Sequence, residues 1–126
     1  MQDQPTAEEL VGAVRDFILN VAMPQLQARD AFHARVAANA LGIVQRELEI
    51  APGANAQEHE RLRQLVGVDG TLEELNRELC NRIRAGEMGP DTPGMTEHLW
   101  DTTLTKLGID QPKYSGYQRA LQARAE

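Results

Sequence analysis

Residues 30–50 constrain the fold of this chain more than any other stretch. At about 100° per residue, their apolar side chains occupy an arc of about 180° around one helix. That arc consists of Phe32, Val36, Ala37, Ala40, Leu41, Ile43, Val44, Leu48 and Ile50. On another side, Ala34, Ala38 and Gly42 recur at every fourth position, and such a row of small residues lets a second helix approach closely. We therefore expect a central helix that neighbouring helices enclose on most sides.

Helical spacing and helix-breaking residues predict a bundle of five to six helices around that segment. The predicted ranges are 6–22, 30–50, 58–66, 71–86, 93–107 and a frayed 117–124. Thr6 and Thr71 are each followed three residues later by a glutamate, which is the capping-box spacing. Pro52 is expected to end the second helix, and Pro112 to exclude helix at Gln111. No segment alternates apolar and polar residues over a strand's length, so the predicted fold class is all-α.

Length and charge indicate the broad class of protein. The chain has 126 residues, which suits a single domain over 1–126. It carries a net charge of −6, which disfavours nucleic acid as a partner. Residues 108–126 are instead a basic tail, which can be mobile, dock back on its own domain or reach a second chain. Without a signal peptide or a long apolar run, we expect a cytoplasmic protein with no membrane partner.

Motifs of catalysis and cofactor binding do not occur in this sequence. It has no phosphate-binding glycine loop and no HExxH zinc motif, and its only serine, Ser115, has no nucleophile-elbow sequence around it. We therefore expect no cofactor, no metal site and no catalytic residue. Cys80 is predicted to be a buried small hydrophobic residue because it lies beside Leu79 and Ile83. Trp100 adjoins the apolar side of the fifth helix and is predicted to belong to the core.

Polar residues on the helix over 30–50 supply the candidate site. His33 lies within the apolar arc, and Arg35 and Asn39 lie one turn apart on a polar ridge. A histidine on a buried face usually exchanges hydrogen bonds within the core, so a structural role is the first interpretation. The functional interpretation is a small polar pocket, in which Arg35 and Asn39 hold an anion or a partner's backbone. Tyr114 follows Pro112 in an extended segment, and one hypothesis places its hydroxyl near Arg35 or His33.

Two motifs resemble those of a small bacterial family without assigned activity. They are FHARVAANALGIVQREL in the second helix and KLGIDQPKY near the C-terminal end. Gln111 and Lys113 depart from the family's second motif, which is closer to Asn-Pro-Arg-Tyr. The resemblance implies that members of this family are encoded beside phosphotransferases of the aminoglycoside- or choline-kinase type and beside acyl-CoA dehydrogenases. The resemblance implies an accessory role near the phosphorylation and oxidation of acyl or hydroxyacyl compounds.

Two functions follow as hypotheses. The first is a non-catalytic helical module that binds a protein partner, by resemblance the phosphotransferase-like enzyme, with self-association as a variant. The second is a protein that binds, or an enzyme that acts on, an acyl or phosphorylated metabolite. In that case His33 is the proton donor or acceptor, and Arg35 and Asn39 hold the anionic group.

Overall fold

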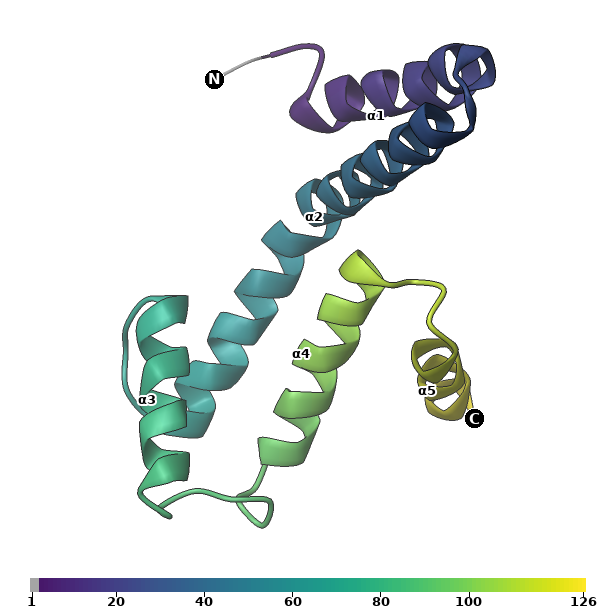
Figure 1. The fold of residues 1–126 in the computed structure, drawn as a ribbon. Helices are drawn as coiled ribbons and strands as arrows, with labels where there is room; N and C mark the ends of the chain where they lie inside the picture. Colours follow the sequence, from purple (N-terminus) through teal and green to yellow (C-terminus); the bar gives the residue numbers. More distant parts are fainter. Residues whose placement is uncertain (1–2) are drawn as a thin grey trace. The chain divides into compact units, whose positions relative to one another are not determined.

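The computed structural model describes residues 3–126, and helices account for all of the regular secondary structure in that range (Figure 1). The elements are α1 (Ala7–Phe17), the π-helical turn η1 (Ile18–Ala22), the 3-10 turn η2 (Met23–Gln25), α2 (Ala28–Val66), α3 (Leu72–Arg84), α4 (Met95–Asp110) and α5 (Ser115–Ala125). The predicted all-α class is therefore confirmed. The first helix is predicted to end at residue 22, which is where η1 ends, and the short turn η2 that follows contains Pro24.

The chain divides into two compact units. Unit 1 ends at Ala51, and unit 2 comprises Pro52–Glu126. The division falls inside α2, at the proline. A single domain over the whole chain stays a prediction, and each unit is described by itself below.

The helix α2 corrects the predicted boundary at Pro52. The sequence predicts one helix that ends at residue 50 and another that begins at residue 58, but α2 continues through the intervening segment with Pro52 inside it. A proline within a helix removes one backbone hydrogen bond and crowds the carbonyl of the residue four positions earlier. Here the helical hydrogen bonds on both sides outweigh that local loss, so the predicted loop over 51–57 is wrong.

In unit 1, α1 packs against the first part of α2 through small residues. A Cβ atom added to Gly42 would lie 3.2 Å from Nε of Arg15, and one added to Gly12 would lie 3.2 Å from Nε2 of Gln45. Ala38 is fully buried. These pairs run in opposite directions along the two helices, so the helices form an antiparallel hairpin. The close approach predicted for the row of small residues on α2 is therefore made within the chain.

Unit 2 has a hydrophobic core between the second part of α2, α3 and α4. Its buried members are Leu62, Val66, Leu75, Leu79 and Met95. Polar contacts fix the turn between α2 and α3: Nε2 of His59 lies 2.8 Å from the carbonyl oxygen of Gly70, and Asn76 donates a hydrogen bond to Glu58. Cys80 lies one residue beyond the buried Leu79, about 100° further round the helix, and is exposed. Its predicted burial is wrong.

The helix α4 turns a different side to the core than the sequence predicts. Its buried residues are Met95, His98, Leu104 and Ile109. Trp100 is 51% exposed and Leu99 is 48% exposed, so the predicted core position of Trp100 is wrong. Because α2 and α3 meet the side of α4 that carries Met95 and His98, the larger apolar side chains remain outside. The helix ends at Asp110, and Gln111 leaves the helical conformation, as expected before Pro112.

Most of the predicted basic tail is helical. Ser115–Ala125 forms α5, which extends the helix expected over 117–124 by two residues at its start and one at its end. Nη2 of Arg124 donates a 2.6 Å hydrogen bond to Asp101 on α4. This contact is of the kind that docking within the chain would make, and the mobility of the tail and its reach to a second chain stay predictions.

Both predicted capping boxes are present, and the one at α3 gives a stability test. The hydroxyl of Thr71 accepts a hydrogen bond from the amide of Glu74, and the Glu74 carboxylate accepts one from the amide of Thr71. We expect Thr71→Ala to lower the free energy of unfolding by about 1 kcal/mol, because the amide of Glu74 loses its acceptor. Urea unfolding followed by circular dichroism measures this. Thr103→Ala, at an exposed position inside α4, is the control and is expected to change stability by less than about 0.5 kcal/mol.

Candidate interaction surface and polar pocket

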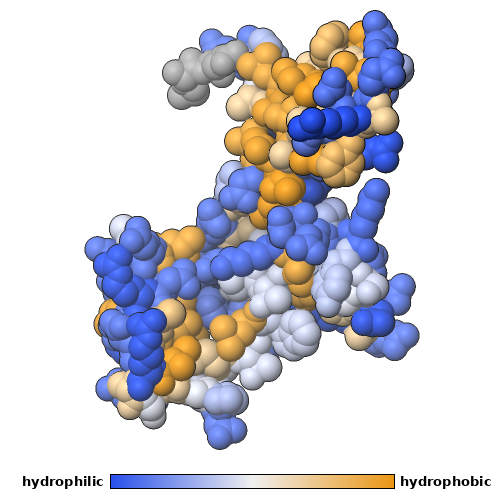
Figure 2. All heavy atoms as spheres, viewed as in Figure 1, coloured by the Kyte–Doolittle hydropathy of each residue, from blue (hydrophilic) through white to orange (hydrophobic). Residues whose placement is uncertain are grey.

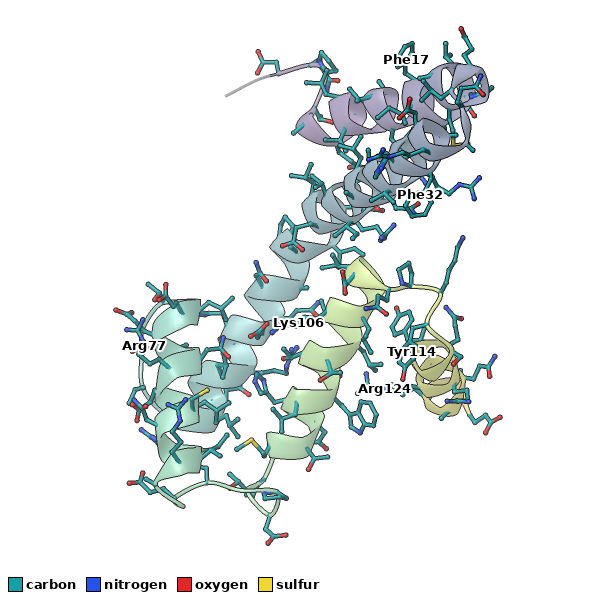
Figure 3. All side chains as sticks on the ribbon, in the orientation of Figure 1. Phe17, Phe32, Arg77, Lys106, Tyr114 and Arg124 are labelled. Atoms are coloured by element: carbon teal, nitrogen blue, oxygen red, sulfur yellow. The ribbon has the colours of Figure 1, made fainter. Side chains whose placement is uncertain are left out.

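Unit 1 exposes large apolar side chains on both of its helices. We call this set the unit 1 surface: Leu10, Val14, Phe17, Val21, Leu26, Phe32, Val36, Val44 and Leu48. Figure 2 shows apolar side chains over much of the visible face of this unit. In Figure 3, Phe17 and Phe32 extend outward from the hairpin. Large exposed apolar areas on a folded chain mark sites of interaction.

The exposure of the unit 1 surface corrects the predicted enclosure of the helix over 30–50. Phe32 is 62% exposed and Val36 is 49% exposed. The helix α1 covers the side with Ala38 and Gly42, which lies on the far side of α2 from the apolar arc. Within unit 1 a single helix packs on this part of α2, and one neighbour cannot cover an arc of about 180° as well as the small-residue side.

The four predicted site residues are all exposed. His33, Arg35 and Asn39 lie on the first part of α2, and Tyr114 precedes α5 in unit 2. His33 makes an edge-to-face contact with the ring of Phe32, with 5.7 Å between ring centroids. The three residues of α2 therefore adjoin the unit 1 surface rather than belonging to a sealed core. The hypothesis of a contact from Tyr114 to Arg35 or His33 stays a prediction.

A polar pocket in unit 2 was not predicted from the sequence. It has a volume of about 270 Å³ and lies between the second part of α2 and the start of α4. Arg61 and Gln64 contribute from α2, and Gly94, Glu97 and His98 from the start of α4. Arg61 and His98 are far apart in the sequence and match no ligand-binding motif, so only the packing of the two helices brings them together.

His98 is the most buried polar residue of the pocket, at 2% exposed. Its Nδ1 finds no hydrogen-bond partner within residues 3–126. Burial lowers the pKa of His98 below its usual 6.5, and the positive charge of Arg61 lowers it further. Glu58 and Asp101 oppose these effects without reversing them. The imidazole is therefore neutral at pH 7, and leaving one of its nitrogens unpaired costs about 1–3 kcal/mol.

The lowered pKa of His98 predicts a loss of stability in acid. The folded chain holds a neutral imidazole, whereas the unfolded chain takes up a proton as the pH falls through about 6.5. The contribution of His98 is therefore complete above that pH and is lost progressively below it. We expect the free energy of unfolding to fall with pH below 6.5, and His98→Gln to make this dependence shallower. Urea unfolding at several pH values measures both slopes, with exposed His33→Gln as the matched control.

The helix α4 also borders an apolar pocket of about 380 Å³. Trp100 is one of the residues that line it. Ile83, Met95 and Leu99 share its lining with the indole ring. No charged side chain within residues 3–126 lines this pocket. Trp100 is the single tryptophan of the chain, so its fluorescence reports on unit 2 alone.

The fold and these two sites define an all-α protein with an exposed apolar surface and a separate polar pocket. The family model described as a domain of unknown function, DUF6285, matches residues 24–114, and the chain belongs to that family. No match was found among curated proteins or among solved structures. Within residues 3–126, no helix combines the length and the apolar character needed to cross a membrane.

Proposed function

We propose that this chain is a non-catalytic helical module that binds a protein partner through the unit 1 surface. The observation that carries the proposal is the exposure of large apolar side chains along both helices of one hairpin. Phe17 is 57% exposed and Phe32 is 62% exposed, one from each helix. Aromatic side chains dominate the energetics of protein interfaces when a partner buries them.

The polar residues next to the unit 1 surface are placed to form the polar edge of an interface. His33 lies within the apolar arc, while Arg35 and Asn39 lie beside it, close to Phe32. A protein interface typically combines an apolar centre with a polar edge that supplies hydrogen bonds. A partner that covers Phe32 and Val36 would therefore also contact these three side chains. We assign them to partner binding.

The partner that we propose is a phosphotransferase-like enzyme of the aminoglycoside- or choline-kinase type, as the resemblance implies. The support for this choice is the resemblance described above, and the chemistry of the unit 1 surface adds that the partner presents an apolar patch. A second copy of the chain is the variant. The row of small residues is already used inside unit 1, so the exposed apolar arc, rather than that row, would form either interface.

Co-purification tests the proposal. The full chain is expressed with the proposed phosphotransferase-like enzyme, and only one of the two carries an affinity tag. We expect a complex that survives at about 150 mM salt, because burial of apolar surface is not screened by ions. Light scattering after size-exclusion chromatography then gives the mass of the complex and of the chain alone.

Each outcome decides between the variants. A complex with the enzyme and a monomeric free chain support the main proposal. A dimer of the chain alone, without enzyme bound, supports self-association in its place. A monomer that binds neither itself nor the enzyme at micromolar concentration contradicts the proposal in both forms.

The alternative, a small-molecule site made by His33, Arg35 and Asn39, receives less support. A small-molecule site usually buries most of its ligand in a concave pocket. The exposure of all three side chains gives a ligand little burial there, whereas a protein can cover them together with the apolar arc.

A further inference from the structure

The start of α4 forms one wall of the polar pocket. Gly94 precedes the helix with a φ of 84°, and no side chain of residues 3–126 caps this end. The amide of Met95 donates to the carbonyl of Thr92, and that of His98 donates to the carbonyl of Gly94. The intervening amides have no acceptor within the helix, as at any helix start, and together with the helix dipole they favour an anion.

A second observation at the same place also points to a ligand. His98 is 98% buried, lines the pocket and leaves Nδ1 without a partner in the part of the chain that the structure describes. Nε of Arg61 is likewise buried and unpartnered there. Its nearest carboxylate oxygen, on Asp101, is 3.8 Å away, which is too long for a hydrogen bond. The other oxygen of Asp101 accepts a hydrogen bond from Arg124.

The charges around the pocket limit what it can take. Arg61 contributes one positive charge, which Asp101 balances in part from 3.8 Å away. Glu97 contributes a negative charge from an exposed position on the same lining. His98 is neutral at pH 7. Its Nδ1 therefore offers a hydrogen-bond donor if it carries the ring hydrogen, and an acceptor if Nε2 carries it. This set matches a single anionic group better than a polyanion, because each further negative charge would meet Glu97 without a second cation to balance it.

We propose that this pocket binds a small molecule through one anionic oxygen group, a carboxylate or a phosphate. The guanidinium of Arg61, Nδ1 of His98 and the free amides at the start of α4 are its donors. The volume of about 270 Å³ holds that group with a short substituent. The site lies wholly within unit 2 and shares no residue with the unit 1 surface, so it can be correct or wrong independently of the proposed partner.

The test is titration of the full chain with inorganic phosphate and, separately, with acetate, at constant ionic strength maintained with potassium chloride. Amide nuclear magnetic resonance shifts are the readout. We expect saturable shifts that centre on Gly94, Thr96, Glu97 and His98. Because the ionic strength is the same in both titrations, a difference between them comes from the added anion. The comparison therefore shows whether the site prefers phosphate or carboxylate.

Variants assign the binding to the pocket. Arg61→Gln is expected to weaken binding about tenfold or more, since a charged donor is lost. Arg63→Gln is the matched control, because Arg63 lies on the same helix, is exposed and pairs with Glu60. Arg61→Lys keeps the charge and, being unable to reproduce the guanidinium contacts, is expected to give intermediate affinity if the fold is retained. Amide spectra of each variant establish folding before the titration.

Three results would overturn the inference. They are shifts that do not saturate by about 100 mM, equal weakening by Arg61→Gln and Arg63→Gln, and shifts spread over the surface instead of the start of α4. The last two indicate an adventitious ion only.

Discussion

Leu62→Ala is expected to destabilise unit 2 by about 2–5 kcal/mol, the largest effect on stability that we predict for a single substitution. Leu62 is fully buried and belongs to the core formed by α2, α3 and α4. The substitution removes three carbon atoms from a site whose neighbours, Val66, Leu75 and Met95, are themselves buried and held by three different helices. A cavity therefore remains, and its cost adds to the lost transfer of apolar surface out of water.

Urea unfolding followed by Trp100 fluorescence measures this effect, because the single tryptophan lies in unit 2. Leu121→Ala makes the same chemical change at a position on α5 that is 39% exposed. We expect that control to cost less, since 39% of Leu121 is already exposed to water and its truncation leaves no enclosed cavity. Equal losses at the two positions would contradict the core assigned to unit 2.

Phe32→Asp is expected to weaken partner binding about 30-fold or more while leaving the fold intact. The side chain of Phe32 is 62% exposed in the chain, so its loss changes the stability of unit 1 by less than about 1 kcal/mol. In a complex, the same substitution removes an aromatic contact and places a carboxylate in an apolar interface. Truncation of such residues typically costs 2 kcal/mol or more, which corresponds to the stated change in affinity.

The experiment compares the affinities of the variant and the parent chain for the proposed phosphotransferase-like partner, or for a second copy if light scattering reveals a dimer. Val68→Asp is the control, because Val68 is also an exposed apolar residue, at 42%, but lies in unit 2 outside the proposed surface. Circular dichroism of both variants establishes that helix content is unchanged. Retention of full affinity by Phe32→Asp would remove the unit 1 surface from the interface.

Much of the secondary structure followed from local signals. Thr6 and Thr71 begin helices because their hydroxyls accept hydrogen bonds from amides three residues later, a contact that needs no tertiary structure. Gly86 follows α3 with a φ of 73°, a conformation that glycine adopts more readily than other residues. Pro52 is the exception, since a proline weakens a helix locally but does not decide whether the residues beyond it stay helical.

The burial of side chains was predicted less well, and the polar pocket was not predicted at all. A helical repeat shows which residues share a side of a helix but not which side a neighbour covers. On α4, Leu99 and Trp100 form the more apolar side, yet α2 and α3 pack against the side with His98. A lone histidine among apolar residues carries no signal of this kind, and Arg61 joins it only through contact between helices.

The sequence by itself determined that this chain is helical, where most of its helices begin and end, and that α2 carries a side on which another helix can approach closely. These properties depend on hydrogen bonds and steric limits between residues a few positions apart. Only the tertiary structure decided that α1 takes the small-residue side of α2, which leaves Phe32 and Val36 exposed. It likewise decided that His98 and Arg61 share a pocket, because the free energy of packing depends on all neighbours of a helix together and not on its own repeat.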